Sequence, residues 1–389
     1  MESDALRGPV AVRQKRVTNA NNASLGFRPS TRVRYAARPQ HLQSFMAQGP
    51  DSSLIRIALD CSGGDHGAAS ALDGATRAVE SADIRAEQVL LVGDPEEIQQ
   101  GLAARGCGDA GFEIVGAPDR LTGRETPVEA LRKFPRNSAS VCVGLVKERA
   151  AHGLVSAGNT GLVVASATLG LRCLEGIRRP GIAVTIRGER GPFTVIDVGA
   201  NPQPKAAHLH QYALMGAAYV HDTFGVERPR VGLMNIGSED AKGHPLVREA
   251  RALLEADHPN FDFVGNVEGV DVFSGVCDVI VCDGFTGNVL LKVSEGCAEY
   301  VVRRFAGLMH EEGVAGDLQK RVLGRIQQDV EFSEYGGALL LGVEGIVTIC
   351  HGRSQGPAIA NALRVAVRAV GARVNEHIVA AARIAADTA

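Results

Sequence analysis

Short, continuously apolar runs alternate with helical segments along most of this chain, and this alternation constrains the fold more than any other feature. After residue 54 the apolar runs read IRIAL, QVLLV, FEIV, GLVS, GIAVTI, FTVID, RVGLMNI, FDFVG and CDVIVCD. A strand that is apolar on both faces is typical of a parallel sheet covered by helices on each side. The chain is therefore predicted to be α/β, with a Rossmann-like, three-layer, mostly parallel sheet.

The first 53 residues differ from the rest in composition. They are rich in Arg, Asn, Ser, Gln and Pro and lack apolar periodicity, which predicts a disordered basic extension over residues 1–53 and one folded domain over residues 54–389. Arg-rich, acid-poor arms are also typical of transit peptides and membrane tethers. An extended or misassigned start, with Met46 as the initiator, is the favoured interpretation.

Composition excludes several functions for the folded part. Beyond residue 53 acidic side chains outnumber basic ones, which argues against a nucleic-acid-binding surface. No apolar run reaches the roughly 18 to 20 residues that cross a bilayer. The eight cysteines show neither disulfide nor metal spacing. These features predict a cytoplasmic protein without a metal site and without a nucleic-acid partner.

Polar loops that contain glycine follow many of the expected strands. They read DCSGGDHG (60–67), VSAGNTG (155–161), DVGANP (197–202), NIGSEDAKG (235–243), GNVEG (265–269) and CDGFTGN (282–288). Ligands of open α/β sheets bind beyond the carboxyl ends of the strands, so we expect these loops to share one edge. Glycine turns before helix N-termini favour an anion such as phosphate. A tight turn with a helix cap explains any one loop equally well.

Two titratable side chains in these loops are candidates for chemistry. His66 follows Asp65, and an imidazole can give or take a proton near neutral pH. Lys242 follows a strand and could hold a phosphate. The alternatives are a capping or core histidine, and a solvated lysine paired with Glu239 or Asp240.

Two motifs match cofactor-binding or metal-binding patterns, but their positions relative to the expected helices and strands do not fit such sites. GCGDAG (106–111) matches the dinucleotide fingerprint, but it follows a helical pattern and leads into a strand, so it is interpreted as a helix C-terminal turn. The two histidines of HLHQ (208–211) point to different sides of a helix and cannot chelate one metal. No cofactor is expected.

Together these loops and the segment GGALLLGVEGIVTICHGRS resemble the phosphate acyltransferases of bacterial phospholipid synthesis, the PlsX family. The resemblance runs from about Ile55 to about Val370. It implies a fold similar to the isocitrate and isopropylmalate dehydrogenases and the phosphate acetyltransferases, a homodimer, peripheral membrane association and no redox cofactor. The chain departs from the family pattern at Cys61 and Ser62, where Ala-Met is usual, and after the DVGAN loop.

The implied reaction moves a long acyl chain reversibly from acyl carrier protein to inorganic phosphate. The acyl phosphate would then serve a membrane glycerol-3-phosphate acyltransferase. No enzyme nucleophile is required, because a thiolate with a conjugate-acid pKa of about 8.5 leaves readily and phosphate is itself a nucleophile. The open alternatives are a short-chain phosphate acetyltransferase that uses coenzyme A and a non-catalytic, membrane-associated scaffold of lipid synthesis. A nicotinamide dehydrogenase is a more distant one.

The loops supply the expected site residues for this chemistry. His66, oriented by Asp65, is expected to manage the proton on phosphate or thiol, and Lys242 and Asn235 are the other expected catalytic residues. The expected phosphate-binding and substrate-binding residues are Gly63, Gly64, Ser156, Gly158, Asn159, Thr160, Asn201, Gly237, Asp283, Gly284 and Asn288.

Residues 298–328 read as two amphipathic helices. One apolar face holds Val301, Phe305, Leu308 and Met309, and the next holds Leu318, Val322 and Ile326, with five flanking Arg and Lys residues. A hairpin that packs into the dimer or the core is the favoured interpretation. The alternatives are a surface that touches anionic lipid and one that receives the acidic acyl carrier protein.

Overall fold

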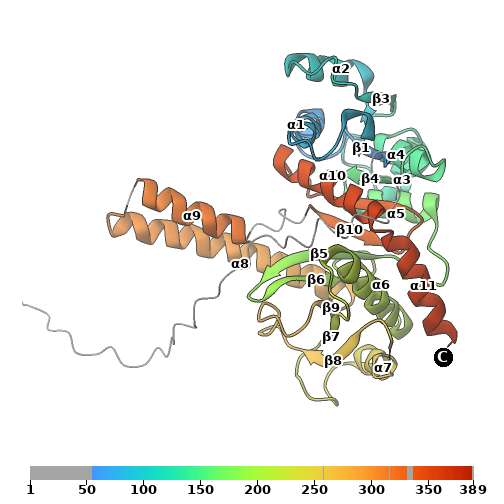
Figure 1. The fold of residues 1–389 in the computed structure, drawn as a ribbon, viewed down its shortest axis with the longest axis vertical. Coiled ribbons are helices and arrows are strands. Elements are labelled where there is room, and N and C mark those ends of the chain that lie inside the picture. The colour runs from blue at the N-terminus through green and yellow to red at the C-terminus, as the bar shows by residue number, and fades with distance from the viewer. Residues whose placement is uncertain (1–54, 257, 315, 331–335, 388–389) are drawn as a thin grey trace, which may run out of the picture. The chain divides into compact units, whose positions relative to one another are not determined.

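Eleven strands form one sheet in the order β3-β2-β1-β4-β11-β10-β5-β6-β9-β7-β8. The structure is a computed structural model that describes residues 55–256, 258–314, 316–330 and 336–387 (Figure 1). The expected disordered extension over residues 1–53 lies outside the described residues.

The bounds of the elements follow the predicted alternation closely. The strands are β1 (Ile57–Asp60), β2 (Val89–Gly93), β3 (Glu113–Gly116), β4 (Gly153–Ser156), β5 (Gly181–Gly188), β6 (Gly191–Ile196), β7 (Arg230–Met234), β8 (Asp262–Val267), β9 (Val279–Val281), β10 (Ala338–Leu341) and β11 (Ile346–Ile349). The α-helices are α1 (Gly67–Glu80), α2 (Pro95–Ala104), α3 (Pro127–Lys133), α4 (Ser138–Lys147), α5 (Thr160–Leu171), α6 (Ala206–Phe224), α7 (Pro245–Leu254), α8 (Gly284–Glu311), α9 (Asp317–Val330), α10 (Gly356–Gly371) and α11 (Val374–Asp387).

Apolar residues on both faces of each strand explain the three layers. Ile57 and Leu59 of β1 join a core that α1, α6, α10 and α11 cover, whereas Ala58 joins a second core under α4 and α5. All three side chains are fully buried. Continuous apolar strands therefore arise here from burial on both sides, as predicted.

The sheet is mostly parallel, as predicted, because seven of its ten strand pairs are parallel. The antiparallel pairs are β11 with β10, β10 with β5, and β5 with β6. Strands β10 and β11 were not predicted, since two runs of four residues separated by Gly342 and Gly345 read as a single apolar segment. As a result β1 to β5 and β11 run one way, and β6 to β10 run the other.

This reversal means that the expectation of one shared edge is wrong. The loops after β1, β4 and β11 open at what we call the first edge, and the loops after β6, β7, β8 and β9 open at the second edge. The antiparallel strands in the middle of the sheet cause the split.

Helices α8 and α9 extend away from the sheet as a hairpin, in orange in Figure 1. The predicted pair of amphipathic helices over residues 298–328 is confirmed, although α8 starts much earlier, at Gly284. Asp283 accounts for that start, because its Oδ1 accepts hydrogen bonds from the backbone N–H groups of Phe285 and Thr286 at 3.0 and 2.9 Å. No helix of the described residues has the length and apolarity to cross a membrane.

Candidate active site

A buried carboxylate joins the first two loops of the first edge. Asp60 ends β1, is 3% exposed, and accepts hydrogen bonds from the backbone N–H groups of Ser62 and Gly63, both at 3.0 Å. Its Oδ2 also accepts the hydroxyl hydrogen of Ser156 at 2.7 Å, and Ser156 Oγ accepts from the N–H of Gly158 at 3.0 Å. Ser156 is fully buried, so it fixes the loops and does not face a ligand. Sequence reasoning did not select Asp60.

Two glycines let these loops approach each other closely. A Cβ added to Gly63 would lie 2.7 Å from the backbone nitrogen of Gly158. Gly64 has φ +84°, and a Cβ there would lie 3.0 Å from the carbonyl oxygen of Gly352. Both expected glycines thus serve to bring three backbone segments together.

The loop after β11 completes the first edge. The N–H of Asp65 donates to the carbonyl of Gly352 at 2.8 Å, and the N–H of Cys350 donates to the carbonyl of Ser156 at 2.8 Å. The Asp65 carboxylate faces this loop, since a Cβ built on Gly352 would lie 3.3 Å from Asp65 Oδ1. The loops after β1, β4 and β11 therefore form one continuous polar surface.

His66 is the first-edge histidine that the sequence predicted. It is exposed and precedes the first turn of α1, where its side chain makes no capping hydrogen bond. Among the described residues no hydrogen bond joins Asp65 to His66, so the expected orientation of the imidazole by its neighbour is not seen. His66 is thus free to meet a ligand.

A second histidine at this edge makes the contact that sequence reasoning missed. The ammonium of Lys292, on α8, lies 3.1 Å from Nε2 of His351 and 2.9 Å from Oε2 of Glu295. Partial burial lowers the pKa of His351, and the charge of Lys292 lowers it further. A neutral imidazole that accepts through Nε2 carries its proton on Nδ1. Lys292 is half exposed and keeps one N–H for a ligand.

Helix α5 adds an anion-binding end to the same edge. Asn159 caps it, with Oδ1 accepting the N–H of Leu162 at 3.0 Å. Thr160 and Gly161 follow in the first turn and are exposed. Backbone N–H groups at a helix N-terminus stabilise negative charge, so this end fits a phosphate or an oxyanion.

Polar groups at the second edge are largely engaged within the protein. Asp197 is fully buried and accepts backbone N–H groups from Ile182, Gly199, Ala200 and Asn201 at 2.7 to 3.0 Å. Burial raises its pKa, and these four hydrogen bonds oppose that rise. This carboxylate therefore shapes a loop and is not available to substrate.

The start of α8 packs directly on that loop. The N–H of Gly284 donates to the carbonyl of Asn201 at 2.9 Å, and a Cβ on Gly287 would lie only 2.0 Å from the carbonyl oxygen of Asp197. Both Asp283 oxygens serve the cap, the second through Thr286 Oγ1 at 2.7 Å. Asn288 is exposed one turn later.

The loop over residues 235–243 is also shaped from within. Asn235 Oδ1 accepts the N–H of Ile236 at 2.8 Å, and Nδ2 donates to the carbonyl of Lys242 at 3.1 Å. Gly237 is buried beneath the Lys242 side chain. The Lys242 ammonium is exposed and has no ion pair among the described residues, whereas Asp240 pairs with Arg251 at 2.7 Å. The alternative interpretation, a Lys242 paired with a neighbouring carboxylate, is therefore not seen among the described residues.

Helix α8 connects the two edges. Asn288, Lys292, Glu295 and Glu299 lie on one face at helical spacing, and each turn advances about 5.4 Å. Lys292 contacts His351, and Glu299 pairs with Arg353 at 3.1 Å. The helix that starts at the second edge therefore delivers its side chains to the loop after β11.

Thiols near both edges are not suited to act as nucleophiles. Cys61 and Cys282 directly follow β1 and β9 and are fully buried. Burial raises the pKa of each, and the neighbouring Asp60 and Asp197 raise them further. The thiolate form is thus disfavoured, which agrees with a reaction that needs no enzyme nucleophile.

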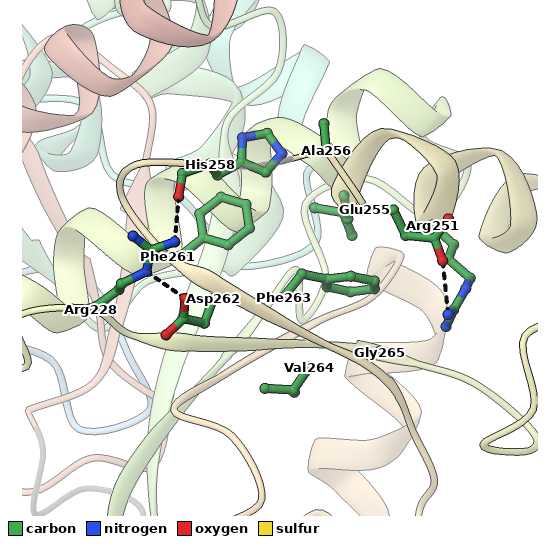
Figure 2. A pocket seen from close by; sticks show the side chains of 11 residues that line it. Arg228, Arg251, Glu255, Ala256, His258, Phe261, Asp262, Phe263, Val264 and Gly265 are labelled. Atoms are coloured by element: carbon green, nitrogen blue, oxygen red, sulfur yellow. Dashed lines mark hydrogen bonds and ion pairs between the residues drawn. The ribbon is translucent and has the colours of Figure 1, made fainter.

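A hollow of about 520 Å³ lies elsewhere, between the end of α7 and β8 (Figure 2). Its arginines already have partners: Arg228 binds Asp262 and the carbonyl of His258, and Arg251 pairs with Glu255 at 2.9 Å. None of the expected site residues lines this hollow, so we do not assign the reaction to it.

The fold is similar to that of phosphotransacetylases. A phosphotransacetylase from Streptococcus pyogenes superposes with a TM-score of 0.58 at 16% identity, covering 85% of this chain and 98% of that structure. The EutD phosphotransacetylase from Staphylococcus aureus gives 0.55 at 15% identity, with coverage of 85% and 98%. At these identities the likeness shows the fold alone.

Sequence relatives are more specific. A protein-family model described as "Fatty acid synthesis protein" matches residues 55–377 of this chain. A phosphate acyltransferase of Cyanothece sp. is 42% identical over 345 residues, covering 86% of this chain and 98% of the relative. One from Dictyoglomus turgidum is 40% identical over 328 residues, covering 83% and 96%. The chain belongs to this family of phosphate acyltransferases, as its loop motifs predicted.

Proposed function

We propose that the protein transfers a long acyl chain from the thioester of acyl carrier protein to inorganic phosphate, and that the acyl phosphate feeds phospholipid synthesis. One observation carries the proposal beyond the family name. Three glycine-bearing loops meet at the first edge, and α8 places Lys292 against His351 beside them. Cationic and N–H donors that converge in this way suit an anionic nucleophile.

Phosphate in this proposal binds at the first edge. The free N–H of Lys292 and the exposed first turn of α5, with Asn159 and Thr160, would hold it. Gly63 and Gly64 let the three loops pack closely beside it, and Asn288 lies one turn before Lys292 on the same helix face. Holding the anion against the carbonyl is the main task, because the leaving thiolate needs little help.

The transfer step balances without a cofactor. A phosphate oxygen attacks the thioester carbonyl carbon, a C–O bond forms and the C–S bond breaks. The proton of hydrogen phosphate passes to the departing sulfur, giving the free thiol and the mixed anhydride. In this proposal that proton is carried by His66, whose side chain makes no hydrogen bond to another described residue, and by His351.

The remaining expected residues take supporting roles in this proposal. Those whose polar groups are engaged internally position the loops: Asp65, Ser156, Gly158, Asn201, Asn235, Asp283 and Gly284. Gly237 packs against the Lys242 side chain and shapes the same loop. The Lys242 ammonium forms no ion pair among the described residues, and we retain it as a second candidate for the phosphate.

We also propose that a second copy covers α8. Phe285, Val289 and Val293 follow one another at one-turn spacing and are 67%, 47% and 64% exposed, and Tyr300 continues at 62%. A long apolar stripe on a soluble helix is expected to be buried by a partner. A homodimer through α8 satisfies this need. A Val293→Glu variant should then run as a monomer in light scattering.

The end of the hairpin farthest from the sheet is the proposed membrane contact. Leu318 is 54% exposed on α9, and Lys320, Arg321 and Arg325 surround it. Apolar and cationic groups side by side suit the surface of an anionic bilayer. Flotation with phosphatidylglycerol vesicles tests this contact, and a protein that stays at the bottom of the gradient would argue against it.

The decisive test of function uses purified protein and a long-chain acyl carrier protein thioester, with and without phosphate. We expect a product with the mass of the acyl phosphate, formed only with phosphate. A product from acetyl coenzyme A alone would indicate a short-chain phosphate acetyltransferase. No loss of thioester with either donor would favour a non-catalytic scaffold.

A further inference from the structure

Three exposed cations surround the N-terminus of α6. Arg178 and Arg179 precede β5, and Lys205 directly precedes the helix. The N–H of Arg178 donates to Gln211 Oε1 at 2.9 Å, which fixes this segment against the second turn of α6. Burial lowers the pKa of His208, and all three cations lower it further, in agreement with their clustering around that ring.

These cations are not neutralised within the described part of the chain. None of the three forms an ion pair there, whereas nearby Arg383 pairs with Glu175 at 2.6 Å. The first turn of α6 holds no acidic residue. Cations at the positive end of a helix repel its dipole, so the cluster disfavours the isolated fold. Such an arrangement is expected where an acidic partner supplies the missing charge.

The cluster adjoins the start of α8. Asn201 Nδ2 donates to the carbonyl of Pro180 at 2.6 Å, and the carbonyl of Asn201 accepts the N–H of Gly284. Two hydrogen bonds therefore connect the cationic segment to the helix that carries Lys292 to the first edge.

The character of this surface favours a protein over a lipid bilayer. The large apolar side chains next to these cations in the chain, Ile177 and Leu209, are buried, whereas a bilayer site combines cations with exposed apolar groups. Resting on the function proposed above, we propose that Arg178, Arg179 and Lys205 form the docking surface for the acidic carrier protein that presents the acyl thioester.

The test compares two donors with the same acyl chain. In the Arg178→Glu, Lys205→Glu double variant, the KM for acyl carrier protein thioester should rise about tenfold, while the KM for the same acyl chain on coenzyme A stays within about twofold. Arg179 is left intact because its charge also reaches the buried Tyr212. Lys147→Glu, at an exposed position near the end of α4 with no ion pair to another described residue, is the matched control and should change neither value.

Direct binding keeps the test independent of turnover. Holo acyl carrier protein, titrated without phosphate, should bind the wild type in a salt-sensitive manner and bind the double variant about tenfold more weakly. Equal KM increases for both donors, or unchanged binding of the carrier, would overturn the proposal. Loss of vesicle flotation with unchanged carrier binding would overturn it in favour of a lipid surface. If no acyl phosphate forms, the proposed function fails while the binding result still decides the docking surface.

Discussion

The two edges of the sheet carry loops of the same sequence type but use them differently. At the first edge, Asp60 and Ser156 tie the loops together below the surface and leave His66, Thr160 and the backbone exposed. At the second edge, Asp197, Asn201, Asn235 and Asp283 direct nearly all their hydrogen bonds inward.

This difference shows that Gly, Asn and Asp after a strand indicate first of all a turn with special backbone and hydrogen-bonding requirements. They do not by themselves indicate a ligand site. A buried aspartate supports the turns at both edges, Asp60 at the first and Asp197 at the second. The edges differ in their other polar side chains, since Asn235 and Asp283 are also used internally, whereas His66 and Thr160 stay exposed.

Removing the ammonium of Lys292 should have the largest effect. Lys292→Met is expected to lower kcat/KM for acyl phosphate formation by about 10² to 10³, the usual loss of one preorganised donor to developing charge. Lys292→Arg should recover part of the lost kcat/KM. Because the side chain is half exposed, circular dichroism should show an unchanged fold. Near-normal activity of Lys292→Met would mean that α8 does not contribute Lys292 to the active site.

Crowding the second edge should cost stability. In Gly287→Ala the new methyl group would collide with the carbonyl of Asp197, so we expect a loss of about 1 to 3 kcal/mol in the free energy of unfolding. Gly296→Ala in the same helix meets no atom within 4 Å and should gain up to about 1 kcal/mol. Urea denaturation measures both. Equal effects of the two changes would mean that α8 does not pack on the Asp197 loop.

The internal support of the first edge should be measurable on its own. Ser156→Ala leaves Asp60 and the N–H of Gly158 each short of one partner, with an expected loss of about 1 to 3 kcal/mol. The control is Ser62→Ala at the neighbouring exposed position, which should stay within about 0.5 kcal/mol. Thermal unfolding distinguishes the two, and an unaffected Ser156 variant would contradict the support role.

The smallest expected effect is a pH dependence through His351. Its pKa in the folded protein is lowered by burial and then by Lys292, so its contribution to stability is fully present above the unfolded value of about 6.5. That contribution should fall as the pH drops through the folded pKa. The stability of the wild type relative to His351→Gln should therefore decrease between pH 7 and pH 5. A constant difference in stability over that range would mean that folding does not lower the pKa of His351.

The fold was more predictable than the site. A run of consecutive apolar residues, such as Ile57, Ala58 and Leu59, predicts a strand that is buried on both faces. Local composition was therefore enough to predict the layers and most of the strands. The reversal of direction could not, because it depends on β5 and β6 pairing as antiparallel neighbours, which the composition of the two runs does not specify.

The contact between Lys292 and His351 was not predictable for a similar reason. These residues are 59 positions apart and meet only because α8 crosses from one edge toward the other. Likewise, the sequence shows that Asn235 follows a strand but not that its amide binds its own loop. Only the family resemblance of whole motifs allowed the function to be predicted before these contacts were known.

Phosphate affinity in two lysine variants distinguishes an anion bound at the first edge, as proposed, from one bound at the second. Titration of inorganic phosphate followed by ³¹P NMR should show at least tenfold weaker binding in Lys292→Met and near wild-type binding in Lys242→Met. The opposite pattern, with phosphate lost from Lys242→Met and retained in Lys292→Met, would place the anion at the second edge and contradict the account.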